Sequence, residues 1–113
     1  MPRRAEPAGI PESIDRAIAV FGSRIKVAAL LALQERAATG AELAARLNVS
    51  RVLVRNHLIE LEQLGILTVQ PPRTEVDVRR RYFHLNRGAL AAAVEALTAF
   101  AIAPSEGTGS GKK

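Results

Sequence analysis

Apolar residues recur at helical spacing along most of the chain between residues 11 and 103. A first amphipathic stretch covers residues 11–21 and a second covers residues 24–36, with Gly22 between them and Ser23 able to cap the second. The second stretch has apolar positions on every side, which is typical of a central helix. We therefore expect two consecutive helices, the second more deeply buried than the first.

Two shorter helical stretches, residues 40–47 and 51–64, follow with three residues between them. Thr39 and Glu42 have the spacing of a capping box at the start of the first, and Asn48 after it is a residue type that tolerates the left-handed backbone conformation. Ser50 can cap the next helix, and Gly65 can end it. Two short helices joined by such a turn have the spacing of a helix-turn-helix.

Beyond Gly65 the pattern changes to strands. Residues 66–70 and 78–85 are rich in β-branched and aromatic side chains, and two prolines between them exclude helix, so a β-hairpin with a long loop is expected. Asn86 can cap a last helix over residues 87–103. The pattern predicts a mainly α fold with a small β-hairpin, a winged helix-turn-helix in the order helix, helix, helix, helix, strand, strand, helix.

This folded domain is expected to span residues 11–103, between a flexible N-terminal arm (1–10) and a flexible C-terminal tail (104–113) rich in Gly and Ser. The chain has 113 residues, no cysteine and a formal net charge of +5. Residues 46–87 carry eight arginines against four acidic side chains, so most of the positive charge is local to the helix-turn-helix and the hairpin. A local excess of positive charge is typical of proteins that bind nucleic acid.

The sequence contains no apolar run long enough to span a membrane, since the longest, residues 27–33, is far shorter than the roughly 20 residues required. We therefore expect a cytoplasmic protein with no membrane partner. The acidic residues are scattered, the serines lie at helix caps or in the tail, and a Gly-rich phosphate loop is missing, so an enzyme is not expected. His57 and His84 lack further ligands nearby in sequence, which argues against a metal site.

Three segments carry a resemblance to a known family. "FGSRIKVAALLAL", "ELAARLNVSRVLVRNHLIELEQLGIL" and "RRRYFHLN" resemble the opening helix, the DNA-reading unit and the returning wing strand of ArsR/SmtB-type winged-helix repressors, over about residues 21–97. The resemblance implies a cytoplasmic homodimeric repressor on a palindromic operator. The family's metal-binding Cys-x-Cys is replaced here by Thr39-Gly40-Ala41, and the last helix lacks His and Asp, so neither a metal nor another cofactor is expected.

Residues for DNA binding follow from the helical wheel of residues 51–64. If Val54, Leu58 and Leu61 face the core, the outer face presents the base-reading candidates Arg51, Val52, Arg55 and Asn56. Arginine suits guanine and asparagine suits adenine in the major groove. Phosphate and wing contacts are expected from Arg46, Ser50, Arg73, Arg79, Arg80 and Arg81. Arginines on an edge hairpin can instead keep the protein soluble and protect the sheet edge, so the arginines of the wing have this alternative role besides DNA binding.

The last helix has more apolar surface than a lone surface helix needs to bury, which suggests a partner surface. Together with the first helix it forms the expected homodimer interface, with the residues Ile14, Ile18, Leu90, Val94, Leu97 and Phe100. Two alternatives remain open: a winged helix that docks proteins through the apolar residues Val52, Leu53 and Ile59, and a non-specific nucleic-acid-binding architectural protein. The sequence also leaves open whether a protein or a small-molecule effector acts on it.

Overall fold

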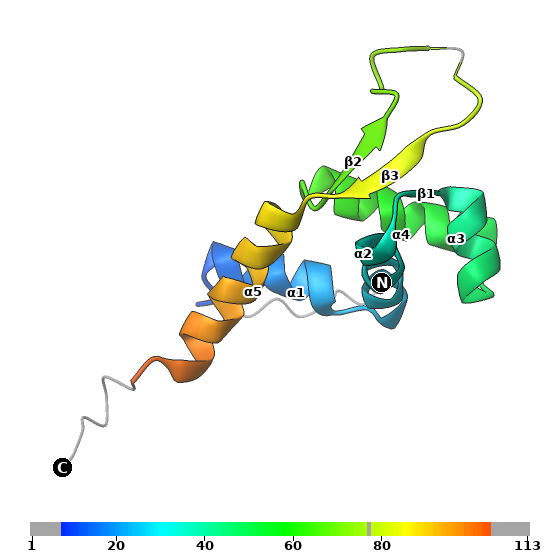
Figure 1. Ribbon diagram of the computed structural model, residues 1–113. Helices are drawn as coiled ribbons and strands as arrows, with labels where there is room; N and C mark the ends of the chain where they lie inside the picture. The colour runs from blue at the N-terminus through cyan, green and yellow to red at the C-terminus, as the bar shows by residue number, and fades with distance from the viewer. Residues whose placement is uncertain (1–7, 77, 105–113) are drawn as a thin grey trace, which may run out of the picture.

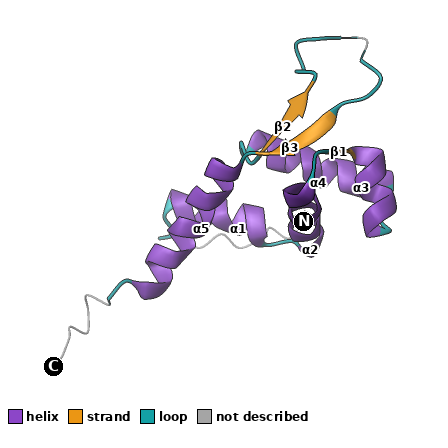
Figure 2. Cartoon of the chain, viewed as in Figure 1, coloured by secondary structure: helices purple, strands orange, loops and turns teal. Residues whose placement is uncertain are grey.

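The computed structural model describes residues 8–76 and 78–104 of the chain. The N-terminal arm and the C-terminal tail expected from the sequence lie mostly outside these residues. Figures 1 and 2 show a mainly helical molecule with a small sheet at one end. In chain order its elements are α1 (Glu12–Phe21), α2 (Arg24–Glu35), β1 (Ala38–Thr39), α3 (Gly40–Leu47), α4 (Arg51–Gln63), β2 (Leu67–Gln70), β3 (Tyr82–Leu85) and α5 (Arg87–Ile102).

The sheet has three antiparallel strands in the order β1-β3-β2, one more than the expected hairpin. In the hairpin Leu67 is opposite Leu85 and Gln70 is opposite Tyr82. The additional strand β1 is only two residues long and pairs with β3, where Ala38 is opposite Phe83. A two-residue strand has no periodicity of its own, so this pairing, made across more than forty residues, leaves no local signal in the sequence.

The second hairpin strand is shorter than expected and begins at Tyr82 rather than at residue 78. Residues 71–76 and 78–81 form an irregular segment, which we call the wing loop, and it projects from the sheet (Figure 1). Arg81 lies inside this loop: its Nε donates a hydrogen bond to the carbonyl oxygen of Pro71 at 3.2 Å, and its Nη2 donates to that of Glu75. Arg79, Arg80 and Arg81 therefore belong to the loop and not to the returning strand, which corrects the expectation for that strand.

The core lies where the inner face of α4 meets α2, α3 and the sheet. Val54, Leu58 and Leu61 are fully buried, as the helical wheel predicts, and Leu43 from α3 is buried with them. Together with Val20, Ile66 and Leu67 they are the largest side chains that the described part of the chain removes from water. Because α4 buries its inner face this completely, its opposite face is fixed toward solvent.

The turn between α3 and α4 has the chemistry expected from the sequence. Thr39 and Glu42 form a complete capping box at the start of α3, with each side chain bonded to the other residue's backbone N–H. Asn48 ends α3 in the left-handed conformation, with φ 57° and ψ 48°. The Ser50 hydroxyl accepts a hydrogen bond from the Leu53 N–H at 3.1 Å and so caps α4. These caps fix where α4 begins.

At the other end of the molecule, α5 packs against α1 and runs out toward the C-terminus (Figure 1). Although it is 16 residues long and built mainly from alanine and larger apolar residues, Ala93 is its only fully buried residue among those that the structure describes. Most of the apolar surface of α5 therefore faces solvent.

Candidate nucleic-acid interface

The outer face of α4 carries the residues predicted to read bases. Arg51, Arg55 and Asn56 are exposed, and in the described part of the chain their side chains make no hydrogen bond or ion pair. Val52 is 70% exposed and Leu53 is 42% exposed, so two apolar side chains share this face. The face thus offers hydrogen-bond donors and apolar groups that have no role inside the protein.

An ion pair that the sequence did not reveal connects α4 to α2. Lys26 is a buried residue, only 8% exposed, and its Nζ lies 2.7 Å from Oε1 of Glu60 and 3.2 Å from the carbonyl oxygen of Ala19. The hydrogen bond and the charge of Lys26 hold the pKa of the Glu60 carboxyl below its ordinary value of 4.5. His57 Nδ1 lies 3.9 Å from the same carboxylate oxygen. Three helices are therefore joined by one lysine, which fixes α4 relative to α1 and α2.

Three of the six residues predicted to contact phosphates or to act in the wing have partners within the chain. Arg46 lies 2.6 Å from Glu35. Arg73 forms a two-pronged pair with Glu62, at 3.1 and 2.8 Å, and this contact raises the pKa of its guanidinium. Arg81 holds the wing loop, as described above. Each of these arginines thus has a structural role, and their partners were not visible in the spacing of the sequence.

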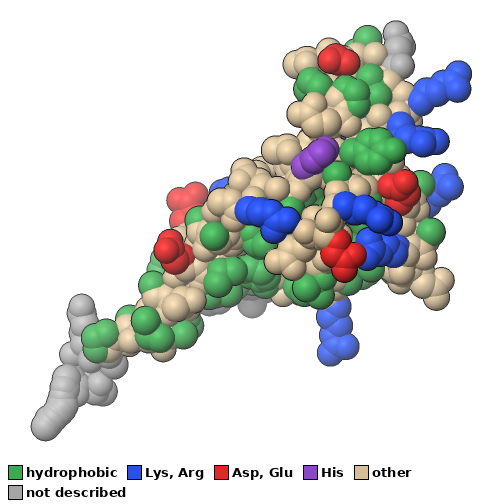
Figure 3. Space-filling view, in the orientation of Figure 1, with side chains coloured by type: hydrophobic (Ala, Val, Ile, Leu, Met, Phe, Trp, Pro, Cys, Tyr) green, Lys and Arg blue, Asp and Glu red, His purple; other side chains and the backbone are tan. Residues whose placement is uncertain are grey.

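The other three predicted residues differ from these. Ser50 is exposed and caps α4 through its hydroxyl oxygen. Arg79 and Arg80 are exposed, and neither bonds to another residue within the ranges 8–76 and 78–104. Figure 3 shows Lys and Arg side chains over the end of the molecule that contains the wing and α3, whereas the α5 end is mainly hydrophobic. On the face in view, the positive side chains therefore gather around the wing and α3 rather than along α5.

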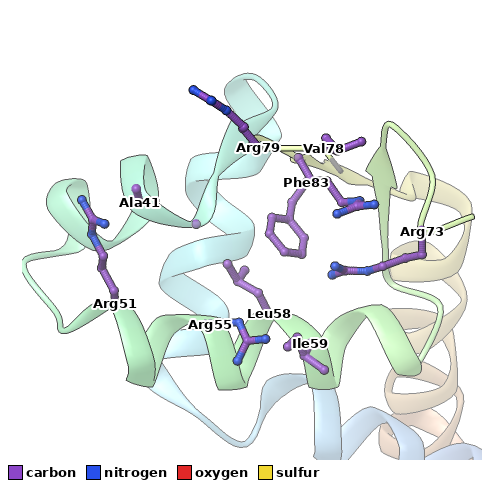
Figure 4. A pocket seen from close by; sticks show the side chains of 11 residues that line it. Ala41, Arg51, Arg55, Leu58, Ile59, Arg73, Val78, Arg79 and Phe83 are labelled. Atoms are coloured by element: carbon purple, nitrogen blue, oxygen red, sulfur yellow. The ribbon is translucent and has the colours of Figure 1, made fainter. Parts of the chain in front are cut away.

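A cavity of about 300 Å³ lies between α4, the start of α3 and the wing loop. Figure 4 shows the Phe83 ring and Leu58 pointing toward each other across it, with Arg55 and Arg73 at its sides. Its lining combines apolar and cationic side chains with backbone: Gly40, Ala41, Arg51, Arg55, Leu58, Ile59, Arg73, Val78, Arg79, Arg81 and Phe83. The predicted reading helix therefore forms one wall of a hollow whose other wall is the wing.

The residues predicted to form a dimer interface divide into two groups. Ile18, Val94 and Phe100 are exposed, and Phe100 is 69% exposed. Ile14, Leu90 and Leu97 are partly buried, and the two leucines pack against the core of the same chain. Only the first group is free to contact another molecule without disturbing the core.

Among the described residues there is no group of three or more His, Cys, Asp or Glu side chains that could hold a metal ion. None of their helices is, by itself, long and apolar enough to cross a membrane; α1 and α2 meet the length and composition criteria only as a pair, which is bent by 80°.

Comparisons with known proteins agree with this geometry. The HTH domain family matches residues 24–78. The fold is similar to that of a protein described as "Possible transcriptional regulator for arsenical resistance" (TM-score 0.63, 24% identity, 82% of this chain and 88% of that one). It is equally similar to an ArsR family transcriptional regulator (TM-score 0.64, 23% identity, 84% and 92%).

It is also similar to the transcriptional repressor BigR from Xylella fastidiosa (TM-score 0.57, 13% identity, 82% and 88%). The sequence matches no curated protein. The domain match covers α2, the two helices of the helix-turn-helix and β2, and the structural likeness extends over most of the chain. Residues 24–78 therefore match the HTH domain family, and the chain has the winged helix-turn-helix fold that is also found in ArsR-family transcriptional regulators.

Proposed function

We propose that the protein is a homodimeric transcriptional repressor that binds a palindromic operator, with α4 in the major groove. The observation that carries the proposal is the outer face of α4, where Arg51, Arg55 and Asn56 are exposed next to a fully buried inner face. An α-helix of this kind fits the width of the major groove. Such a protein acts where the DNA is, so its location in the cytoplasm is part of the same proposal.

The chemistry of the α4 face suits direct readout. Arg51 and Arg55 can each donate two hydrogen bonds to O6 and N7 of guanine, and Asn56 can bond N6 and N7 of adenine. Val52, which is 70% exposed, can contact the methyl group of thymine. Each good bidentate pair contributes about 1–3 kcal/mol of discrimination against the wrong base. Three such residues are enough for a short half-site.

Backbone contacts are proposed chiefly for Arg79 and Arg80, because these two exposed wing residues bond to no other residue that the structure describes. Cations of this kind neutralise phosphates and give affinity without sequence preference. Ser50 and Arg46 flank the start of α4 and are proposed as secondary phosphate contacts. Arg73 and Arg81 would act indirectly, because Glu62 and the wing loop already hold them.

Dimerisation is proposed through α1 and α5. The exposed side chains Ile18, Val94 and Phe100 lie on these two packed helices, and covering them with a second copy would remove apolar surface from water. A two-fold dimer would present two α4 helices to half-sites about 34–36 Å apart, one turn of DNA. Occupancy of an operator by such a dimer excludes other proteins from that DNA, and repression is the proposed output.

A second candidate is supported by one observation. Val52 and Leu53 are exposed apolar residues on the first turn of α4, where a reading helix would use polar side chains. Such a pair could dock another protein instead of touching bases. The arginines beside them and the excess of positive charge favour DNA.

The test is selection of duplexes from a random pool by the purified full chain at physiological salt, followed by sequencing. The proposal expects an enriched inverted repeat. A matched pair of variants assigns the reading: Arg55→Ala should alter or abolish the enriched motif, whereas Arg24→Ala, which removes the same charge from the N-terminal end of α2, should preserve it. A wild-type pool without an enriched sequence would favour docking or non-specific binding.

A further inference from the structure

We propose that the cavity between α4 and the wing loop is a binding site for a small organic anion with a flat apolar body, such as an aromatic carboxylate. The ligand would occupy the protein in place of DNA and act as an effector. The binding site itself is argued from the shape and lining of the cavity and does not depend on DNA binding. The regulatory effect of the ligand rests on the proposed DNA-binding function.

The size and the floor of the cavity favour an apolar body. A volume of about 300 Å³ is at the lower end of the range for small-molecule sites, and Ile59 and Val78 line it with partly exposed apolar side chains, with the buried Leu58 and Phe83 behind them. The Phe83 ring points toward the space (Figure 4) and is 7% exposed, so a flat apolar group could pack on Ile59 and Val78 and touch only the edge of this ring. A phosphate group has no apolar part to pack against this lining, so the lining favours an organic anion over a simple phosphate.

The rim of the cavity favours an anion. Among the described residues, the ionisable side chains that line it are all arginines: Arg51, Arg55, Arg73, Arg79 and Arg81. Arg73 is paired with Glu62, but Arg81 bonds to neutral carbonyl groups and keeps an uncompensated charge, and Arg51 and Arg55 have no acidic partner among the described side chains. A guanidinium next to an apolar floor can hold a carboxylate through paired hydrogen bonds.

The position of the cavity gives the ligand its effect. Arg51 and Arg55 line it, and the same two residues are proposed to read bases. A carboxylate held by Arg55 would withdraw that guanidinium from guanine, and a body wedged against the wing loop would stand between the wing and a DNA backbone. Ligand and operator would therefore compete for the same side chains.

The test uses 1-naphthoate as the probe and 1-naphthylmethanol as its uncharged control, titrated into the isotope-labelled full chain without DNA and followed by amide NMR shifts. We expect naphthoate to shift the amides of Gly40, Ala41 and Ile59, and the alcohol to bind at least about tenfold more weakly, because a charge-assisted hydrogen bond is lost. Arg55→Ala should weaken naphthoate binding by a similar factor, and Arg24→Ala should not.

Three results would each contradict the proposed site. These are amide shifts confined to α5 or α2, an affinity for the alcohol equal to that for naphthoate, and equal effects of Arg55→Ala and Arg24→Ala on naphthoate binding. The regulatory part is tested separately with the enriched duplex. Saturating naphthoate should lower the affinity of the protein for that duplex, and an unchanged affinity would overturn competition. If no duplex is enriched but naphthoate still maps to the cavity, the site is supported and only the proposed DNA function fails.

Discussion

Replacing Asn48 by alanine should destabilise the protein, whereas replacing it by glycine should not. Asn48 sits at φ 57° and ψ 48°, between α3 and α4. In this conformation the N–H of Val49 donates to the carbonyl oxygen of Ala44 at 3.0 Å and closes the end of α3. The backbone of the helix-turn-helix therefore depends on one residue in a region that alanine avoids.

The magnitude follows from this geometry. The left-handed conformation costs a residue with a Cβ roughly 1–2 kcal/mol, and local hydrogen bonds of the asparagine side chain offset part of this cost. We expect Asn48→Ala to lower the unfolding free energy by about 1 kcal/mol, or roughly 4–6 °C in Tm. Glycine has no steric cost at this φ, but it loses about 0.5–1 kcal/mol in chain entropy, so Asn48→Gly should fall within about 0.5 kcal/mol of the wild type.

The assay is urea denaturation followed by far-UV circular dichroism, with all three proteins at one concentration because dimerisation would couple stability to concentration. An unchanged urea slope would show that only stability differs. Equal midpoints for wild type and Asn48→Ala, or a glycine variant as unstable as the alanine variant, would refute the argument from the left-handed turn.

Three further predictions concern the site and its supports. On the enriched duplex, Arg55→Ala should reduce discrimination against a scrambled sequence, whereas Arg80→Ala should weaken both duplexes alike and make the salt dependence shallower by about one phosphate contact. Phe100→Glu should yield monomers in sedimentation, since this side chain is 69% exposed on α5. Lys26→Met should reduce the unfolding free energy at neutral pH, and this difference should shrink below pH 4.5, because protonation of Glu60 removes the ion pair in the wild type too.

The direction of the last prediction follows from the pKa of Glu60, which is lower in the folded protein than its ordinary value of 4.5. The ionised Glu60 therefore stabilises the fold fully above pH 4.5, and this stabilisation is lost as the pH falls through the lower, folded pKa. A difference that grows in acid would contradict it. Arg55→Ala and Arg80→Ala with identical effects would contradict the division between bases and phosphates. A Phe100→Glu protein that stays dimeric would exclude this face as the interface.

Local patterns were sufficient to predict the helices and the turn. Gly22, Asn48 and Gly65 lie where α1, α3 and α4 were expected to end, and Ser23, Ser50 and Asn86 all cap helices through their side chains. Such signals depend on neighbouring residues only, so they can be read from one sequence. The apolar ladder of α4 likewise predicted which side of that helix is buried.

What could not be predicted depends on contacts between distant segments. The strand β1 exists because β3 lies beside it, and the partners of Arg46 and Arg73 are eleven residues away. From the sequence these two arginines were expected to be free to bind phosphates, whereas in the structure each forms an ion pair with a glutamate. The burial of Lys26 against Glu60 was hidden for the same reason: a lysine within an apolar helix gives no indication of the carboxylate that will face it.

The cavity beside α4 follows the same rule, because its walls come from α3, α4, the wing loop and β3, which meet only in the folded chain. Arg51 and Arg55 were recognisable as exposed residues of a reading helix. Their proximity to Phe83 and to the wing loop required the sheet to be in place.

The most direct test of the central claim, that α4 reads a sequence, is a comparison of two dissociation constants of the wild-type protein at physiological salt: one for the enriched inverted repeat and one for the same duplex scrambled. The account predicts a preference of about a thousandfold or more, with one dimer per repeat. Equal, salt-sensitive binding to both duplexes would contradict it and leave α4 as a docking surface or a non-specific contact.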